Sequence, residues 1–237
     1  MTQTRQLFGT DGIRGVAGEF PLTRESTTLI GRALGHDLIR GNANARVIIG
    51  QDTRQSSGWI ADRLSHGLAS VGVAVSSAGV ITTPGVAYLA RSQSFDAGVV
   101  ISASHNPWTD NGIKVFSGDG YKLPDTHELA IEKEIFGLLQ DPAATPQPDS
   151  ATTVSSLPGD AELRAAYVKW LASNIASDLS RLRVVVDCAN GAAAVEAPEV
   201  FRAIGVTAKF LHSAPDGQNI NEQCGALHPE TVARFVN

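Results

Sequence analysis

The chain has 237 residues, of which 43% are hydrophobic and 18% are charged, with a formal net charge of -5 at pH 7. This length corresponds to between one and two domains, and the hydrophobic fraction excludes a wholly disordered protein. The 19 basic side chains are outnumbered by 24 acidic ones. That balance argues against the basic surface of a nucleic-acid-binding protein, so no nucleic-acid partner is expected.

The longest apolar runs, such as 184–186, are far shorter than the roughly 18 residues that cross a membrane. Residues 1–12 carry no apolar stretch behind a basic end, as a secretory signal would. We therefore expect a cytoplasmic protein with no membrane partner. The two cysteines, Cys188 and Cys224, are too few for a disulfide framework or a four-ligand zinc site, so both are expected to be reduced thiols.

Residues 1–140 alternate short apolar runs with longer segments of helical period, as α/β proteins do. Runs without alternation, such as Val47, Ile48 and Ile49, indicate strands buried on both faces. In chain order the pattern predicts helix 23–42, strand 46–50, helix 56–71, strand 73–76, helix 84–89, strand 97–102, strands 113–116 and 120–123, and helix 125–139. The expected fold is a mostly parallel mixed sheet with helices on both faces.

Prolines stand among alanine, threonine and serine between residues 141 and 159, a composition that favours neither a helix nor a core. The sequence predicts a linker over 146–159 that joins a domain over 1–145 to a second domain over 160–237. In the second domain the pattern predicts helix 160–171, strand 182–187, helix 192–204, strand 206–211 and helix 229–237. Two strands are fewer than a usual sheet contains, so we expect an incomplete α/β domain.

The segment 101–107, Ile-Ser-Ala-Ser-His-Asn-Pro, follows a predicted buried strand. Ligands of open α/β sheets gather beyond the carboxyl ends of strands, so a site is expected here. Ser104 offers a nucleophile, His105 a proton-transfer group and Lys114 a cation. A polar turn closed by Asn106 and Pro107 explains the same residues equally well. A serine hydrolase is disfavoured, because the segment lacks the Gly-x-Ser-x-Gly turn.

The segment 8–15, Phe-Gly-Thr-Asp-Gly-Ile-Arg-Gly, is rich in glycine, which lets backbone amides approach an anion. Arg14 adds a planar donor suited to phosphate, although a plain turn with a surface arginine is the default interpretation. Neither nucleotide-binding motif is matched, which disfavours a dinucleotide-binding protein. In the segment 50–54, Asp52 and Arg54 are consistent with a surface ion pair, and we interpret the segment as supporting scaffold.

These segments, with 110–114, 187–191, 219–221 and 228–230, resemble the amino-terminal half of the α-D-phosphohexomutase superfamily, and their combination resembles its glucosamine branch. The resemblance implies interconversion of glucosamine 6-phosphate and glucosamine 1-phosphate through a phosphoserine enzyme and a bisphosphorylated sugar, in amino-sugar and peptidoglycan precursor synthesis. It implies that Ser104 carries the phosphoryl group and binds Mg2+ through it, with Arg14, His105 and Lys114 as catalytic residues. It also implies a set of residues that bind the sugar phosphate: Thr10, Asp11, Gly12, Arg14, Asn106 and Lys114. Whether His105 or Lys114 transfers the proton stays open.

Two departures from the superfamily pattern bear on activity. Its aspartate-rich metal loop, Asp-Gly-Asp-x-Asp-Arg, does not occur, and Asp216-Gly217-Gln218 is too poor in carboxylates to replace it. Ala226 and Leu227 stand where the pattern has Ser-Thr. We therefore expect a truncated mutase that is inactive alone. A non-catalytic α/β binding or interaction module, a mutase acting on glucose or mannose phosphates, and a homodimer stay open as alternatives.

Overall fold

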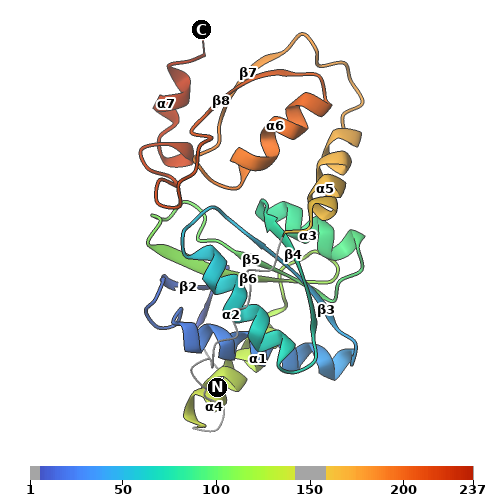
Figure 1. Ribbon diagram of the computed structural model, residues 1–237, viewed down its shortest axis with the longest axis vertical. Helices are drawn as coiled ribbons and strands as arrows, with labels where there is room; N and C mark the ends of the chain where they lie inside the picture. Colours follow the sequence, from blue (N-terminus) through green and yellow to red (C-terminus); the bar gives the residue numbers. More distant parts are fainter. Residues whose placement is uncertain (1–5, 142–158, 237) are drawn as a thin grey trace.

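The computed structural model describes residues 6–141 and 159–236 (Figure 1). The expected domain limit at residue 145 and all of the expected linker except Gly159 lie outside these residues. The first part of the chain forms a six-stranded sheet in the order β1-β2-β6-β5-β3-β4. Its elements are β1 (Phe8–Gly9), β2 (Gly12–Val16), α1 (Arg24–Gly41), β3 (Arg46–Gln51), α2 (Ser57–Ala69), β4 (Ala74–Val80), α3 (Thr83–Ser92), β5 (Ala97–Ile101), β6 (Asp110–Ser117) and α4 (Asp125–Gln140).

The sheet is mixed, as expected, but it is not mostly parallel. Only the pairs β3–β4 and β3–β5 are parallel, whereas β5–β6, β2–β6 and β1–β2 are antiparallel. The reason lies in the connections: α2 and α3 supply the crossovers that parallel strands need, while the short segment 102–109 allows only an antiparallel turn between β5 and β6. The expected strand over 120–123 is reduced to a single bridge between Phe116 and Lys122.

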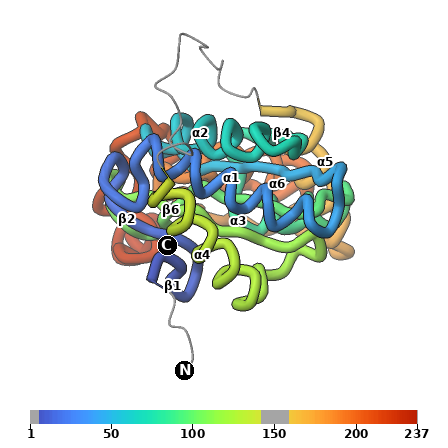
Figure 2. The backbone as a smooth tube through the Cα atoms, turned by 90° about the horizontal axis from the view of Figure 1, so that it is seen from below, coloured from blue at the N-terminus to red at the C-terminus, as the bar shows by residue number. Residues whose placement is uncertain are grey.

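Helices cover both faces of the sheet, which confirms that expectation. Along β3, Val47 and Ile49 pack into the core cluster that contains side chains of α1, α2 and α4. Ile48, between them, points to the opposite cluster with Val86 and Leu89 of α3. Figure 2 shows α1 alongside α2, a pair that packs together over the sheet. Burial on both faces explains why the strand reads as a continuous apolar run.

The second part of the chain contains a parallel pair of strands, β7 with β8, as the sequence predicts. Its elements are α5 (Ala161–Ser173), β7 (Arg183–Asp187), α6 (Ala193–Ala203), β8 (Thr207–Leu211), the 3-10 turn η1 (Gly225–Leu227) and α7 (Pro229–Ala233). No helix within residues 6–141 and 159–236 is both long and apolar enough to cross a membrane.

Helix α5 bridges the two parts of the chain. Tyr167 is only 3% exposed and belongs to the core cluster of α3. Trp170 stacks on Tyr88 of α3, with ring centroids 4.3 Å apart. The backbone N–H of Asp160, which caps α5, donates to the carbonyl of Ser77 in β4 at 2.8 Å. The helix that opens the second part is therefore anchored on the first.

The two-stranded sheet predicts that the second part opens more readily than the first. Residues 184–186 of β7 are only half-buried, whereas residues 47–49 of β3 are almost fully buried. An isolated strand pair is marginal in water, so in the monomeric 237-residue chain we expect amide hydrogens of 184–186 to exchange at least about tenfold faster than those of 47–49. Hydrogen–deuterium exchange measures both segments in one sample, and equal protection would contradict this expectation.

Candidate active site at the serine loop

The segment 102–109, here called the serine loop, leaves the carboxyl end of β5 and returns into β6. Ser104 and His105 are exposed on it, as the sequence predicts for a site at this edge of the sheet. Ser104 has a φ of 58°, in the left-handed region that non-glycine residues rarely adopt. The Oγ of Ser102 accepts from the backbone N–H of Ser104 at 3.2 Å. The loop thus presents the Ser104 side chain in one defined backbone conformation.

A buried ion pair lies beneath this loop. The guanidinium of Arg54, whose side chain is fully buried, pairs with the carboxylate of Asp52. The Nη2 of Arg54 also donates to the carbonyl oxygens of Ser104, at 3.2 Å, and Asn106, at 2.7 Å. The scaffold role predicted for the segment 50–54 is thus supported, but the prediction that its ion pair lies on the surface is wrong. Both side chains are buried, because the serine loop covers the Arg54 guanidinium.

A second donor reaches the same two carbonyl oxygens from the second part of the chain. The Nδ2 of Asn221 lies 2.9 Å from the oxygen of Ser104 and 3.0 Å from that of Asn106. The sequence contains Asn221 in a segment that carries the family resemblance, but nothing in its local pattern indicates this contact. Hydrogen bonds between residues more than a hundred positions apart become visible only once the chain is folded.

The glycine-rich opening segment forms a tight hairpin. Gly9 pairs with Gly12 across the turn that carries Thr10 and Asp11. Gly12 has a φ of 86°, and a Cβ there would lie 2.3 Å from the carbonyl oxygen of Ile113 in β6. This glycine therefore allows the close approach of two strands, and the expected contact of its backbone with an anion stays a prediction.

The hairpin brings a carboxylate to two predicted cations. Asp11 Oδ2 lies 2.6 Å from Lys114 Nζ and 3.4 Å from Arg14 Nη2. Burial by itself would raise the pKa of Asp11, but the hydrogen bond and charge of Lys114, aided by Arg14, outweigh it and lower that pKa. The Asp11 carboxylate is therefore held between the side chains of Lys114 and Arg14. Within the described part of the chain, the hydrogen bonds of this cluster do not reach His105 or Thr10, both of which are exposed.

This charge cluster lies on strands that adjoin the serine loop. Arg14 of β2 is in register with Gly112 of β6. The carbonyl of Gly112 accepts from the backbone N–H of Ser102, at the start of the serine loop, at 3.0 Å. At the other end of the loop, Asn106 Nδ2 donates to Asp110 Oδ2 at 2.8 Å, which fixes that side chain. The serine loop therefore leads into β6, the strand that carries Lys114 and pairs with β2, which carries Arg14.

Metal ions bind in proteins through clusters of carboxylate, imidazole or thiolate groups. Among the described residues, the cluster of three metal-ligating groups is Asp187, His212 and Cys224, in the second part of the chain. It mixes oxygen, nitrogen and sulfur, whereas Mg2+ prefers oxygen ligands. Asp216 is engaged in a turn, where its Oδ1 accepts from the N–H groups of Gln218 and Asn219. This cluster therefore does not suit Mg2+, and neither Asp187 nor Asp216 lies in the serine loop.

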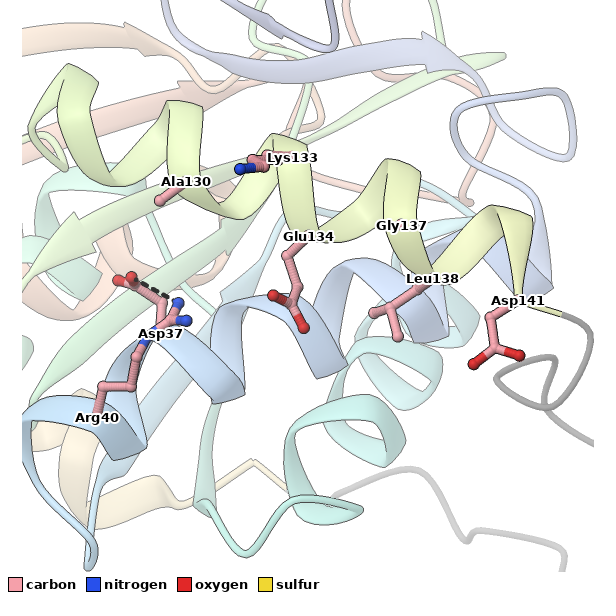
Figure 3. Close-up of a pocket in the computed structure, with 8 residues that line it drawn as sticks. All are labelled: Asp37, Arg40, Ala130, Lys133, Glu134, Gly137, Leu138 and Asp141. Carbon is pink, nitrogen blue, oxygen red and sulfur yellow. Dashed lines mark hydrogen bonds and ion pairs between the residues drawn. The ribbon is translucent and has the colours of Figure 1, made fainter.

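A separate groove lies between α1 and α4 (Figure 3). Its side chains carry both signs of charge, and Asp37 pairs with Arg40 at 3.3 Å. None of its lining residues takes part in the hydrogen bonds that hold the serine loop. The residues that line it are Asp37, Arg40, Ala130, Lys133, Glu134, Gly137, Leu138 and Asp141. The groove is therefore not a second wall of the candidate site.

The close approach at Gly12 predicts a specific cost of substitution. Gly18 provides a matched control, because it also has a positive φ, 97°, but a Cβ there would meet nothing within 4 Å. Gly18→Ala should cost about 1–2 kcal/mol of unfolding free energy through its backbone conformation alone. Gly12→Ala should cost at least about 1 kcal/mol more, because the methyl group meets the Ile113 backbone. Urea unfolding of both variants measures the difference, and equal losses would show that β2 does not need this approach.

Comparison with known proteins agrees with this architecture. Residues 5–141 match the family described as phosphoglucomutase/phosphomannomutase, alpha/beta/alpha domain I. Over 98% of its length the chain is similar to the phosphoglucosamine mutases of Koribacter versatilis, at 55% identity, and of Solibacter usitatus, at 50%. The chain spans about half the length of these curated relatives, 50% in both cases.

A solved structure shares the fold of nearly the whole chain. The crystal structure of a phosphoglucomutase/phosphomannomutase family protein from Burkholderia thailandensis superposes with a TM-score of 0.75 at 26% identity. The match covers 97% of this chain and 49% of that one. With the family match running through β1 to α4 and the serine loop between β5 and β6, this chain belongs to the phosphoglucomutase/phosphomannomutase family.

Proposed function

We propose that this chain carries the phosphoserine half of a phosphoglucosamine mutase, which interconverts glucosamine 6-phosphate and glucosamine 1-phosphate. The observation that carries the proposal is the exposed Ser104 on a loop whose backbone is held by Arg54 and Asn221. Phosphoryl transfer depends mainly on positioning and on neutralising charge. The held loop supports the first, and Lys114 of β6 and Arg14 of β2 support the second. The sugar assignment rests on the names of the relatives at 50% and 55% identity.

In the proposed reaction, Ser104 carries a phosphoryl group at the start of each turnover. The free hydroxyl of the sugar phosphate attacks phosphorus, the bond to Ser104 Oγ breaks, and a bisphosphorylated sugar forms. That intermediate reorients, and its other phosphoryl group returns to Ser104 Oγ. The number of phosphoryl groups is conserved, because each half-reaction moves one between oxygen atoms.

The side chains near Ser104 have separable tasks in this proposal. Lys114 contacts Asp11 at 2.6 Å, and with Arg14 it offsets negative charge on the transferring group. The proton of the attacking hydroxyl passes to the exposed His105, whereas Lys114 is engaged with Asp11. Thr10 and Asn106, on the hairpin turn and the serine loop, are the proposed polar contacts to the sugar phosphate.

The family resemblance implies Mg2+ at the phosphoserine. When bound, the ion would neutralise charge on the phosphoryl oxygens. Of the described residues, Ser104 is the one placed to contact it, through its phosphate. The remaining ligands would come from outside these residues, since the mixed cluster at Asp187 does not suit a hard cation.

Phosphate uptake by Ser104 tests the proposal. The natural full-length protein, incubated with labelled glucose 1,6-bisphosphate, should incorporate label at Ser104, whereas Ser104→Ala should take up none and lose at least about a thousandfold in mutase rate. Thr109→Ala, which removes an exposed hydroxyl from the same loop, is the matched control and should be labelled normally. Label retained by Ser104→Ala would exclude Ser104 as the phosphorylated residue, and a parent protein without label would leave a binding module as the function.

Sugar specificity separates the remaining alternatives. The same protein should convert glucosamine 6-phosphate with a much higher kcat/KM than glucose 6-phosphate or mannose 6-phosphate. The reverse preference would assign the chain to another branch of the family.

The 237 residues tested by themselves are expected not to turn over, even with Ser104 already phosphorylated. The relatives are twice as long, and productive positioning of a substrate can supply roughly 7–11 kcal/mol of the barrier reduction. A coupled assay with glucosamine 6-phosphate, Mg2+ and bisphosphate primer checks this, with a full-length relative as the control. Turnover within tenfold of that relative would show that these residues suffice.

A further inference from the structure

The serine loop is held by two donors that come from opposite parts of the chain. Arg54 Nη2 and Asn221 Nδ2 each donate to both carbonyl oxygens, those of Ser104 and Asn106. Arg54 follows β3 of the first part, and Asn221 belongs to the loop after β8 of the second. Each carbonyl oxygen therefore accepts from both donors, and the second part of the chain reaches the backbone of the candidate nucleophile itself.

This arrangement matters because Ser104 does not hold its conformation by intrinsic preference. Its φ of 58° lies in the left-handed region, which is unfavourable for a residue with a Cβ. Such a conformation persists only where the surroundings impose it. The Ser102 hydroxyl holds the N–H of Ser104, and Arg54 and Asn221 hold the carbonyl oxygens of Ser104 and Asn106, so these two donors help to fix the backbone from which Ser104 Oγ projects.

Asn221 is suited to this task and is not needed to join the two parts. Three other hydrogen bonds cross the same interface without touching the serine loop. They are Thr53 Oγ1 to the Asn190 carbonyl at 2.5 Å, the Gln55 N–H to the Gly217 carbonyl at 2.9 Å, and Gln218 Nε2 to Gln55 Oε1 at 2.9 Å. The Asn221 amide donates to the serine loop instead.

We propose that Asn221 is a positioning residue for phosphoryl transfer, which holds Ser104 in its reactive orientation through the backbone of the serine loop. The proposal rests on the proposed mutase function for its kinetic consequence, but its structural part stands on the contacts alone. In this proposal Arg54 of the first part and Asn221 of the second part together hold the backbone of the serine loop. Without Asn221, these two carbonyl oxygens would be bound by Arg54 alone.

The test uses Asn221→Gly in the natural full-length protein. Asn221 has a φ of 61°, which glycine adopts freely, so the variant removes the amide donor without straining the backbone. Asn221→Asp is the second variant, because it keeps the side-chain size and tolerates this φ but replaces the donor by an acceptor facing two carbonyl oxygens. Gln218→Ala is the matched control, since it breaks a side-chain bond across the same interface outside the serine loop.

Hydrogen–deuterium exchange supplies the readout that needs no activity. Both Asn221 variants should exchange the amide hydrogens of Ser104 and Asn106 at least about tenfold faster than the parent protein, with residues 47–49 unchanged. Gln218→Ala should leave the loop amides as they are. Loop exchange that is unchanged in both Asn221 variants overturns the proposal, whatever the protein catalyses.

Steady-state kinetics separates positioning from a merely structural role. Both Asn221 variants should lose roughly tenfold to a hundredfold in kcat, with KM for glucosamine 6-phosphate within about twofold. Gln218→Ala should keep both values. A lower melting temperature with kcat unchanged would overturn the proposal in favour of simple interface stability. If the parent protein shows no mutase activity, the proposed function fails, and the exchange result alone then decides whether Asn221 holds the loop.

Discussion

The buried pair of Arg54 and Asp52 is the interaction on which the candidate site depends. Asp52 lies just beyond β3, where its N–H donates to the carbonyl of Ile101 at the end of β5. Its carboxylate accepts from Ser57 Oγ at 2.8 Å and pairs with Arg54, which binds the serine loop. Removing one member of a buried pair leaves an uncompensated charge, at a cost of about 3–5 kcal/mol. The same contacts therefore join two parallel strands and fix the loop between β5 and β6.

The antiparallel half of the sheet supplies the charges around that loop. Because the chain turns back after the serine loop, β6 runs beside β5 and places Lys114 opposite Val100. The hairpin of β1 and β2 then adds Arg14 and Asp11 on the far side of β6. A fully parallel sheet would have sent the chain through a crossover helix after β5. The change of strand direction thus places the strands that carry Lys114 and Arg14 beside β5, from which the serine loop leaves.

The sequence predicts the parts of the fold whose burial is regular. The strand expected over 46–50 is β3 (Arg46–Gln51), and the helix expected over 125–139 is α4 (Asp125–Gln140), because continuous apolar runs and helical periods record two-sided and one-sided burial directly. A loop after the buried strand follows from the same rule, but Ser102 and Ala103, directly after β5, are still buried, and exposure begins at Ser104. The hairpin of β1 and β2 has no such period. It is fixed instead by distant groups, such as Glu132, whose carboxylate accepts from the N–H groups of Leu7 and Phe8.

The position of Asn221 can be traced to one carboxylate in the second part of the chain. Asp187 ends β7, and its two oxygens accept from the N–H groups of Ala189 and Gly225, each at 2.9 Å. Burial alone would raise the pKa of Asp187, but these N–H groups and His212 outweigh it and lower that pKa, so the group stays charged. The carbonyl of Ala189 in turn accepts from the N–H of Asn221 at 2.9 Å.

The loop that carries Asn221 is therefore braced by hydrogen bonds at the end of β7, beside the buried side chains of Ile220 and Cys224. A two-stranded sheet is marginal on its own, yet it can hold Asp187 firmly enough to orient three loop segments. This explains how a part of the chain with little buried apolar surface can still determine the backbone geometry of Ser104. The second part of the chain orients the serine loop. A few hydrogen bonds from Asn221 are enough for this, because Arg54 of the first part already binds the same two carbonyl oxygens.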